Sequence, residues 1–304
     1  MELKHLNAFL IVAEELHFGR AAERLGIAQP QLSQWIKRLE IDLGAALFVR
    51  STRSVHLTHH GEAILRPAGK ALDWARRTEL AVLATDPEVF GRVRVGYAGA
   101  SSREVLPMVA RAVRTAEPGV ELDLRSMVYG GHAPGLVAAG ELDVGFSRLP
   151  LHQSGVQGRV FAYERVLAAL PADHRLAARE EVPLVELARE PWVSFPATKG
   201  SNVREIGLRL AHEAGFTPRI AQEAPDSYAI LGLVAAGVGV SLTVSSVRHI
   251  QTPGLVYREL AGEPNFLAAI ITWADAPNRA TQRVLDIMEQ VLPTPELPEG
   301  RVLD

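Results

Sequence analysis

The sequence predicts an α/β protein in which a small winged helix-turn-helix module precedes a larger, bilobed α/β domain. Apolar residues recur at helical spacing through most of the first 43 positions, and a strand, turn and strand pattern follows over residues 48–57. From residue 91 strands and helices alternate, and the alternation starts again near residue 166. A chain of 304 residues also suits one small and one larger domain.

Composition places the chain among cytoplasmic globular proteins. Hydrophobic residues make up 47% and charged residues 22% of the sequence, which allows substantial cores to be buried. The sequence contains no cysteine, which excludes disulfides, thiolate metal sites and a cysteine nucleophile. The first 20 residues mix charged with apolar side chains, unlike a secretory signal peptide. A net charge of −3 argues against a protein that coats nucleic acid without specificity.

The first module, residues 1–57, is expected to contain three helices and a wing. Apolar spacing indicates a first helix around Leu6 and a short second helix over residues 20–25. Gly26 suits the turn after it, because glycine tolerates the left-handed conformation that ends many helices. A third helix begins at Pro30, whose missing N–H needs no partner at a first helical position, and it closes near Gly44.

A long helix is predicted over residues 58–88, with Thr58 as its N-cap. Its apolar residues form one stripe with no obvious cover in the small first module. An exposed stripe of that length is a liability on a monomer, so we expect this linker helix to pair two subunits. Pro67 should kink it or interrupt one hydrogen bond. Asp86-Pro87 should end it, because a residue before proline avoids the α region.

Residues 89–292 are expected to form the larger domain, with two lobes. Lobe I would comprise residues 91–160 and 266–292, and lobe II residues 161–265. The alternation of strands and helices predicts a mainly parallel sheet, and a strand over residues 266–273 returns the chain to lobe I. The proline-rich tail, residues 293–304, is expected to be disordered.

The outer face of the third helix carries polar side chains suited to DNA. The side chains that can exchange hydrogen bonds with base edges are Gln29, Gln31, Ser33 and Gln34. Lys37, Arg50 and Arg53 suit phosphates or a narrow minor groove. A helix pair of this kind can lie in the major groove. On pattern alone the alternative stays open, namely a structural three-helix module with a solvated face.

A more specific signal lies in the order of residues. The chain resembles the LysR family of transcriptional regulators in Leu16 to Leu25 (LHFGRAAERL), Ala28 to Ile36 (AQPQLSQWI), Leu39-Glu40, Leu43-Gly44, Leu47-Phe48, Arg50, Arg53, Leu57-Thr58 and Gly61. Weaker matches continue in Gly140 to Phe146, His174 to Ala177 and Leu233 to Val240, so the resemblance covers nearly the whole chain. His17 to Arg20 and Phe146 to Leu149 are most similar to the members that control the breakdown of aromatic compounds.

The resemblance implies a winged helix-turn-helix, a linker helix that pairs subunits, and an effector domain like a periplasmic binding protein. It implies a tetramer, a dimer of dimers, that binds and bends dyad-symmetric promoter DNA, contacts RNA polymerase, and activates or represses transcription when an inducer occupies the cleft. The candidate DNA-binding residues are then Arg20, Gln29, Pro30, Gln31, Ser33, Gln34, Lys37, Arg50 and Arg53.

The inducer site is expected between the two lobes. Ligands of open α/β sheets bind beyond the carboxyl ends of strands, near helix N-termini, where free N–H groups favour anions. The candidate positions are Gly99, Ala100, Ser101, Ser102, Tyr129, Gly130, Phe146, Arg148, Thr198, Lys199, Ser201, Asn202, Asp226 and Ser227. Arg148 and Lys199 can neutralise a carboxylate, so we expect a small organic anion, such as an aromatic carboxylate or a ring-cleavage product. Turn residues and surface cations are the alternative interpretation at each position.

Enzyme motifs are absent from the sequence. It has no G-x-S-x-G elbow, no phosphate loop ending in Gly-Lys-Ser/Thr and no H-E-x-x-H. The adjacent His59 and His60 cannot share one helix face for metal binding. We therefore expect no catalytic residue, cofactor or metal. The alternatives to a regulator are a cytoplasmic small-molecule-binding protein and an α/β enzyme with a structural N-terminal helical module.

Overall fold

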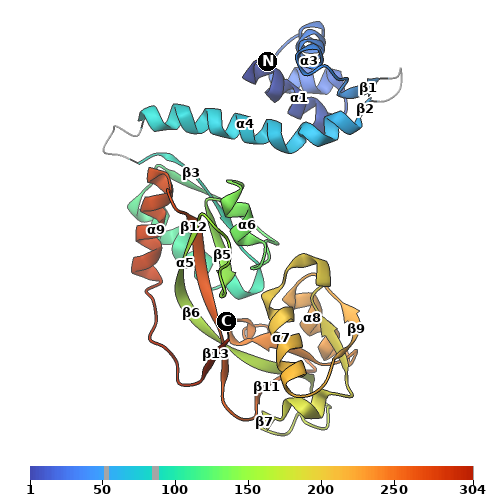
Figure 1. Cartoon of the computed structure of the whole chain (residues 1–304), viewed down its shortest axis with the longest axis vertical. Helices are drawn as coiled ribbons and strands as arrows, with labels where there is room; N and C mark the ends of the chain where they lie inside the picture. The colour runs from blue at the N-terminus through green and yellow to red at the C-terminus, as the bar shows by residue number, and fades with distance from the viewer. Residues whose placement is uncertain (51–54, 84–88, 304) are drawn as a thin grey trace. The chain divides into compact units, whose positions relative to one another are not determined.

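The computed structural model describes residues 1–50, 55–83 and 89–303, and Figure 1 shows their secondary structure. The chain divides into two compact units, Met1–Pro87 (unit 1) and Glu88–Asp304 (unit 2). Each unit has a hydrophobic core of its own. Within the described ranges, no helix has the length and apolar character needed to cross a membrane.

Unit 1 is helical except for a short wing. Its described elements are α1 (Leu3–Glu15), α2 (Phe18–Leu25), α3 (Gln29–Leu43), β1 (Phe48–Arg50), β2 (Val55–Leu57) and α4 (His59–Leu83). α2 starts after His17, because the Nδ1 atom of this side chain accepts the N–H groups of Gly19 and Arg20 at 3.1 and 3.2 Å. Gly26 and Gly44 adopt the left-handed conformation that ends α2 and α3.

The core of unit 1 also covers the first half of α4. Its largest fully buried side chains are Phe9, Leu32, Ile36, Leu39 and Leu47. The α4 residues that pack on them are Ile64, Leu65, Ala68, Ala71 and Leu72. The expectation that this apolar stripe has no obvious cover in the small module was therefore wrong for the first half of α4. Farther along α4, Trp74 is exposed.

Unit 2 consists of two lobes. Lobe I contains β3 (Gly91–Gly96), η1 (Ala100–Ser102), α5 (Val105–Ala116), β4 (Val120–Arg125), α6 (Ala133–Ala138), β5 (Val144–Arg148) and α9 (Arg279–Val291). Lobe II contains β7 (Glu181–Val182), η2 (Leu184–Leu187), β8 (Pro191–Ser194), η3 (Ala197–Lys199), α7 (Asn202–Glu213), β9 (Arg219–Glu223), α8 (Ser227–Ala235), β10 (Ser241–Val244), η4 (Ser245–Val247) and β11 (Leu255–Leu260). The long strands β6 (Val156–Pro171) and β12 (Asn265–Ala274) belong to both lobes.

The two long strands cross between the lobes in opposite directions. Residues 156–165 of β6 pair antiparallel with β12, and residues 166–171 pair antiparallel with β10 and β11. The described part of the main sheet has the order β4-β3-β5-β12-β6-β11-β7. β3, β4 and β5 are parallel, as predicted, but the sheet as a whole is mixed. The prediction of a mainly parallel sheet was wrong because a chain that crosses and returns must place its two crossing strands antiparallel.

The C-terminal segment also differs from the prediction. A disordered tail was expected over residues 293–304, yet β13 (Arg301–Leu303) pairs parallel with the first three residues of β12. Leu303 is 1% exposed and lies in the lobe II core with Leu267. The Arg301 guanidinium binds both carboxylate oxygens of Glu213, at 2.6 and 3.0 Å. Pairing with an open strand edge and burial of one leucine therefore order a segment whose composition alone suggested disorder.

We predict that Leu303→Ala lowers the free energy of unfolding of unit 2 by about 2–5 kcal/mol, the usual effect of truncating a buried leucine. Leu297→Ala, in the same tail but 72% exposed, is the matched control and should leave stability nearly unchanged. Guanidinium denaturation of the full-length chain measures both effects. Equal stability of the two variants would contradict the placement of β13 against the lobe II core.

Candidate nucleic-acid interface and ligand pocket

The outer face of α3 presents the polar residues singled out from the sequence. Gln29, Pro30, Gln31, Gln34 and Lys37 are exposed and Ser33 is half-buried. The opposite face of the helix is buried through Leu32, Ile36 and Leu39. Because the two sets alternate with helical periodicity, burying the apolar stripe leaves the polar set in solvent. Ala28 stands at the N-cap of α3 and no side chain caps this helix.

The structure describes side-chain contacts of Arg20 but says less about the two wing arginines. Arg20 is exposed, but its Nε donates to Glu15 Oε2 at 3.2 Å, and Arg24 also contacts Glu15, at 3.1 Å. Hydrogen bonds from Arg20 and Arg24 lower the pKa of Glu15, so its carboxylate stays ionised under mildly acidic conditions. The contact with Glu15, within unit 1, therefore holds the Arg20 side chain. Arg50 ends β1, and Arg53 lies outside the described residues.

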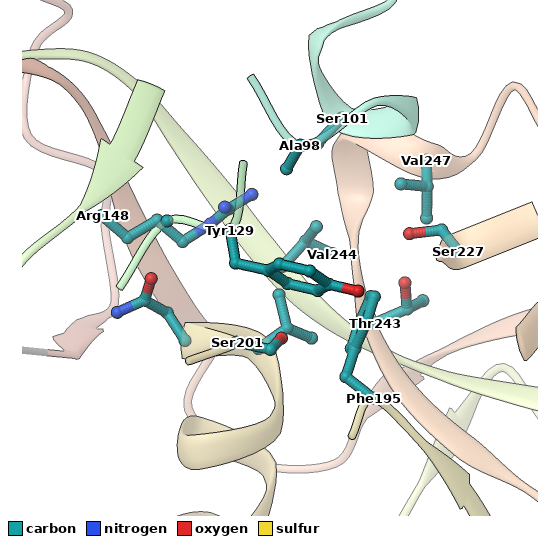
Figure 2. Close-up of a pocket in the computed structure, with 13 residues that line it drawn as sticks. Ala98, Ser101, Tyr129, Arg148, Phe195, Ser201, Ser227, Thr243, Val244 and Val247 are labelled. Carbon is teal, nitrogen blue, oxygen red and sulfur yellow. The ribbon is translucent and has the colours of Figure 1, made fainter. Parts of the chain in front are cut away.

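A pocket lies between the two lobes of unit 2 (Figure 2). We call it the cleft pocket, and the residues that line it are Ala98, Ser101, Tyr129, Gly130, Arg148, Phe195, Ser201, Asn202, Val203, Ser227, Thr243, Val244 and Val247. The structure thus brings together seven of the sequence candidates, namely Ser101, Tyr129, Gly130, Arg148, Ser201, Asn202 and Ser227. They come from the end of β5 and from loops and helix starts of both lobes, as the rule for open α/β sheets predicts.

Seven other candidates do not line the cleft pocket: Gly99, Ala100, Ser102, Phe146, Thr198, Lys199 and Asp226. Phe146 packs in the lobe I core, edge-on to Phe161 with ring centroids 5.5 Å apart. Lys199 and Thr198 are exposed on η3. The Asp226 carboxylate caps α8, accepting the N–H of Ala229 at 2.9 Å. These residues have structural or surface positions that the sequence pattern did not distinguish from lining positions.

Six lining residues were missed: Ala98, Phe195, Val203, Thr243, Val244 and Val247. Thr243 and Val244 end β10, and Phe195 follows β8 directly. The carboxyl-end rule that selected Arg148 could have selected these three as well. Val203 and Val247 carry no comparable signal, because an apolar residue in a helix or a short turn reads as ordinary core.

Arg148 is the charged residue of the cleft pocket. It is 8% exposed and forms an ion pair with Glu164 of β6, which is 6% exposed. Among the described residues, its Nε atom has no hydrogen-bond partner. Figure 2 shows the guanidinium directed toward the centre of the pocket. The pair balances the two charges at the site. The Nε–H of Arg148 is buried without a partner among the described residues, which costs free energy and favours an acceptor that could reach it.

Two helix N-termini converge on the same pocket. Ser201 caps α7, its hydroxyl accepting the Arg204 N–H at 3.4 Å, and Ser227 is the first residue of α8. The Asn202 Oδ1 atom is buried and has no partner among the residues described. The N-terminus of a helix carries partial positive charge, which favours anions. The pocket therefore combines a buried guanidinium, hydroxyl groups and two positive helix ends with apolar side walls.

The lobes touch each other beside the pocket. The Tyr129 hydroxyl of lobe I donates to the Pro225 carbonyl oxygen of lobe II, and its ring packs edge-on to Phe195. The Gly131 N–H donates to the Gly200 carbonyl oxygen at 3.0 Å. Burial, and secondarily the nearby Asp226 carboxylate, raises the pKa of Tyr129, so the phenol remains a donor at neutral pH.

The cavity is small in this arrangement of the lobes. Its volume is about 30 Å³, whereas one ordered water needs at least about 10–15 Å³. Pockets that hold larger organic ligands usually measure about 300–1,000 Å³. A ligand with an aromatic ring therefore requires the lobes to separate or the Tyr129 ring to move.

Comparison with known protein families matches almost the whole chain. Residues 3–62 match the family described as "Bacterial regulatory helix-turn-helix protein, lysR family". Residues 87–293 match the family described as "LysR substrate binding domain". The two matches correspond to unit 1 without most of α4 and to most of unit 2.

Individual relatives are similar along nearly their full length. The chain is 40% identical to the HTH-type transcriptional regulator ShiR of Corynebacterium glutamicum (strain R) over 288 residues, 94% of this chain and 98% of the relative. It is 34% identical to AlsR of Bacillus subtilis (strain 168), covering 86% of each chain. Among solved structures, full-length CbnR complexed with its target DNA is similar with a TM-score of 0.77 and 27% identity, covering 96% of this chain and 100% of that one.

The buried Arg148–Glu164 pair can be tested by a double-mutant cycle. We predict that Glu164→Leu alone lowers the free energy of unfolding by about 3–5 kcal/mol, because it leaves a buried charge unpaired. Arg148→Met combined with Glu164→Leu should be less destabilised than Glu164→Leu alone, since no charge then remains buried. Chemical denaturation of the four proteins measures the coupling. Strictly additive effects of the two substitutions would show that the side chains do not interact as described.

Proposed function

This chain belongs to the LysR family of helix-turn-helix transcriptional regulators, and we propose that α3 reads a dyad-symmetric promoter site while the cleft pocket senses a small organic anion. The protein is a DNA-binding transcriptional regulator and not an enzyme. The observation that carries the choice of ligand is Arg148, a nine-tenths buried guanidinium in the pocket lining whose Nε has no hydrogen-bond partner among the described residues.

α3 is suited to reading bases because its exposed side chains are long, polar and mostly neutral. Gln31 and Gln34 can each make paired hydrogen bonds with an adenine edge in the major groove. Lys37, one turn farther along, suits a phosphate contact, which adds affinity without sequence preference. Arg50 and Arg53 are proposed phosphate or minor-groove contacts from the wing.

The cleft pocket is suited to a carboxylate for reasons of charge. A carboxylate oxygen can accept the free Arg148 Nε–H, and such charge-assisted hydrogen bonds are stronger than neutral ones. Ser101, Ser201 and Ser227 offer further donors around it. Phe195, Val244 and Val247 form apolar walls that suit the hydrocarbon part of an aromatic carboxylate or ring-cleavage product.

Ligand binding is proposed to change the arrangement of the lobes. The cavity admits only water as the lobes lie here, so an organic anion must break or bend the Tyr129 contact with lobe II. A ligand can shift this equilibrium only by as much as it prefers one arrangement over the other. By linkage, operator DNA must then change the affinity for the anion by the same factor that the anion changes the affinity for DNA.

Subunit pairing is proposed through the part of α4 beyond the core of unit 1. Trp74 is an exposed, large apolar side chain there, and burying it against a second copy would remove apolar surface from water. We further propose a dimer of dimers that contacts RNA polymerase on promoter DNA and therefore acts in the cytoplasm.

For DNA recognition, we predict that Gln31→Ala reduces the ratio of operator to random-DNA affinity about 5- to 100-fold, the effect of losing one good base contact. Lys37→Ala should weaken binding to both DNAs and reduce the slope of log affinity against log salt by about 1. The operator is a duplex selected from a random pool by the wild type, and Asn7→Ala, exposed on α1, is the control. Unchanged discrimination in Gln31→Ala would remove this residue from the interface.

For ligand sensing, we predict that Arg148→Met reduces carboxylate affinity at least about 10-fold, since a charged hydrogen-bond partner is lost. Lys199→Met should leave it unchanged, because Lys199 is exposed and does not line the pocket. Calorimetry of the full-length chain against aromatic and aliphatic mono- and dicarboxylates supplies the measurement. Binding of neutral sugars or amines, with no binding of any carboxylate, would refute the anion while leaving the regulator intact.

A further inference from the structure

The start of α4 rests directly on the backbone of Leu47, in the segment that enters the wing. Gly61 lies in the first turn of this helix, and a methyl group in place of its hydrogen would overlap the Leu47 carbonyl oxygen and lie 2.8 Å from Leu57 Cδ2. The obstacle is backbone and not the end of a flexible side chain, so it cannot swing aside. Any side chain at residue 61 must therefore push α4 away from the wing.

Thr58 fastens the same contact with hydrogen bonds. Its hydroxyl donates to the Ala46 carbonyl oxygen at 2.7 Å and accepts the Gly61 N–H at 3.0 Å. Its own N–H donates to the Leu47 carbonyl oxygen at 2.9 Å. A single residue thus caps α4 and ties the helix to the segment that enters the wing.

The other side of this segment is fastened to α3. The Glu40 carboxylate accepts the N–H groups of Leu47 and Phe48 at 2.8 and 3.4 Å, and the Glu40 carbonyl oxygen accepts the Ala45 N–H at 3.1 Å. Leu47 and Phe48 are both buried. Glu40, Leu47, Thr58 and Gly61 therefore form a continuous connection from α3 to α4, which we call the α3–α4 junction.

The angle at the α3–α4 junction determines where the far end of α3 lies. α3 has 15 residues, so it is about 22 Å long at 1.5 Å per residue. A rotation of about 10° at one end moves the other end by about 4 Å, which exceeds the base-pair rise of about 3.4 Å. A small change in the angle between α3 and α4 at Gly61 therefore moves the far end of α3 by about the separation of two neighbouring base pairs.

We propose that the Gly61–Leu47 contact and the Thr58 hydroxyl fix the angle between α3 and α4 and thereby set the half-site spacing that a pair of subunits accepts. The inference rests on the proposed pairing of subunits through α4. Thr58 and Gly61 then determine specificity through geometry, since dimeric helix-turn-helix proteins read half-sites at the separation of their two recognition helices. They are positioning residues and need no contact with DNA.

The test measures the separation of the two α3 helices directly. The chain has no cysteine, so Ile41→Cys, at an exposed position of α3, gives one spin label per subunit. Pulsed electron spin resonance then reports the shortest distance between labels in the full-length oligomer. The variants are Thr58→Val, which removes both hydroxyl hydrogen bonds at nearly equal volume, Gly61→Ala, which introduces the overlap, and Thr58→Ser, which retains the hydroxyl as the control.

We expect Thr58→Ser to keep the wild-type distance, while Thr58→Val and Gly61→Ala shift or broaden it. On synthetic duplexes carrying the selected half-site at different spacings, the latter two should prefer a spacing changed by about one base pair or accept a broader range. Their affinity for a single half-site should change less than about 3-fold, because the base contacts remain.

A Thr58→Val variant with the wild-type distance and spacing preference overturns the proposal, whether or not Gly61→Ala folds. Failure of the proposed function has a different signature. If the wild type sediments as a monomer, subunits do not pair through α4. If the wild type selects no sequence from random DNA, the chain does not recognise an operator. Neither result depends on the junction variants.

Discussion

The antiparallel pairing of β6 with β12 is the constraint on which unit 2 depends. β6 joins β12 over residues 156–165 and then joins β10 and β11 over residues 166–171, so one strand serves both lobe cores. Because the two crossing strands hold the lobes together, the carboxyl end of β5 and the starts of α7 and α8 face each other across the crossing. The cleft pocket is a consequence of this topology, and β13 adds a third strand beside β12 at the same crossing.

The pair of buried charges at the pocket also depends on the crossing strands β6 and β12. Arg148 ends β5 beside β12, and Glu164 lies on β6 near the point where it changes partners. Two buried charges at this place are expensive to desolvate, and a pair of apolar residues of similar volume is often at least as stable. The pair therefore suggests a role other than stability. An arginine whose charge is balanced by Glu164, and whose Nε has no hydrogen-bond partner among the described residues, is suited to respond when a second carboxylate arrives.

Sequence reasoning succeeded where one local pattern decides the structure. The third helix, expected from Pro30 to near Gly44, and the strand expected over residues 266–273 agree with α3 and β12 to within one residue at each end, because local sequence patterns mark these ends. It failed where distant segments meet. β13 is ordered by an open edge of β12, Leu72 is covered by the core of its own unit, and Lys199 points to solvent although it stands next to lining residues in sequence. Arg148 could be selected by its position at a strand end, but its partner Glu164 could not, because only the register of two strands brings them together.

Amide hydrogen exchange of the full-length chain, with and without a saturating carboxylate, tests the central claim most directly. An anion held between the lobes should slow exchange in the first turn of α7 and at the end of β5 together, and should alter exchange at Tyr129 to Gly131, where the lobes touch. Protection limited to one lobe, or confined to unit 1, would contradict the account, because the ligand would then not bridge the crossing.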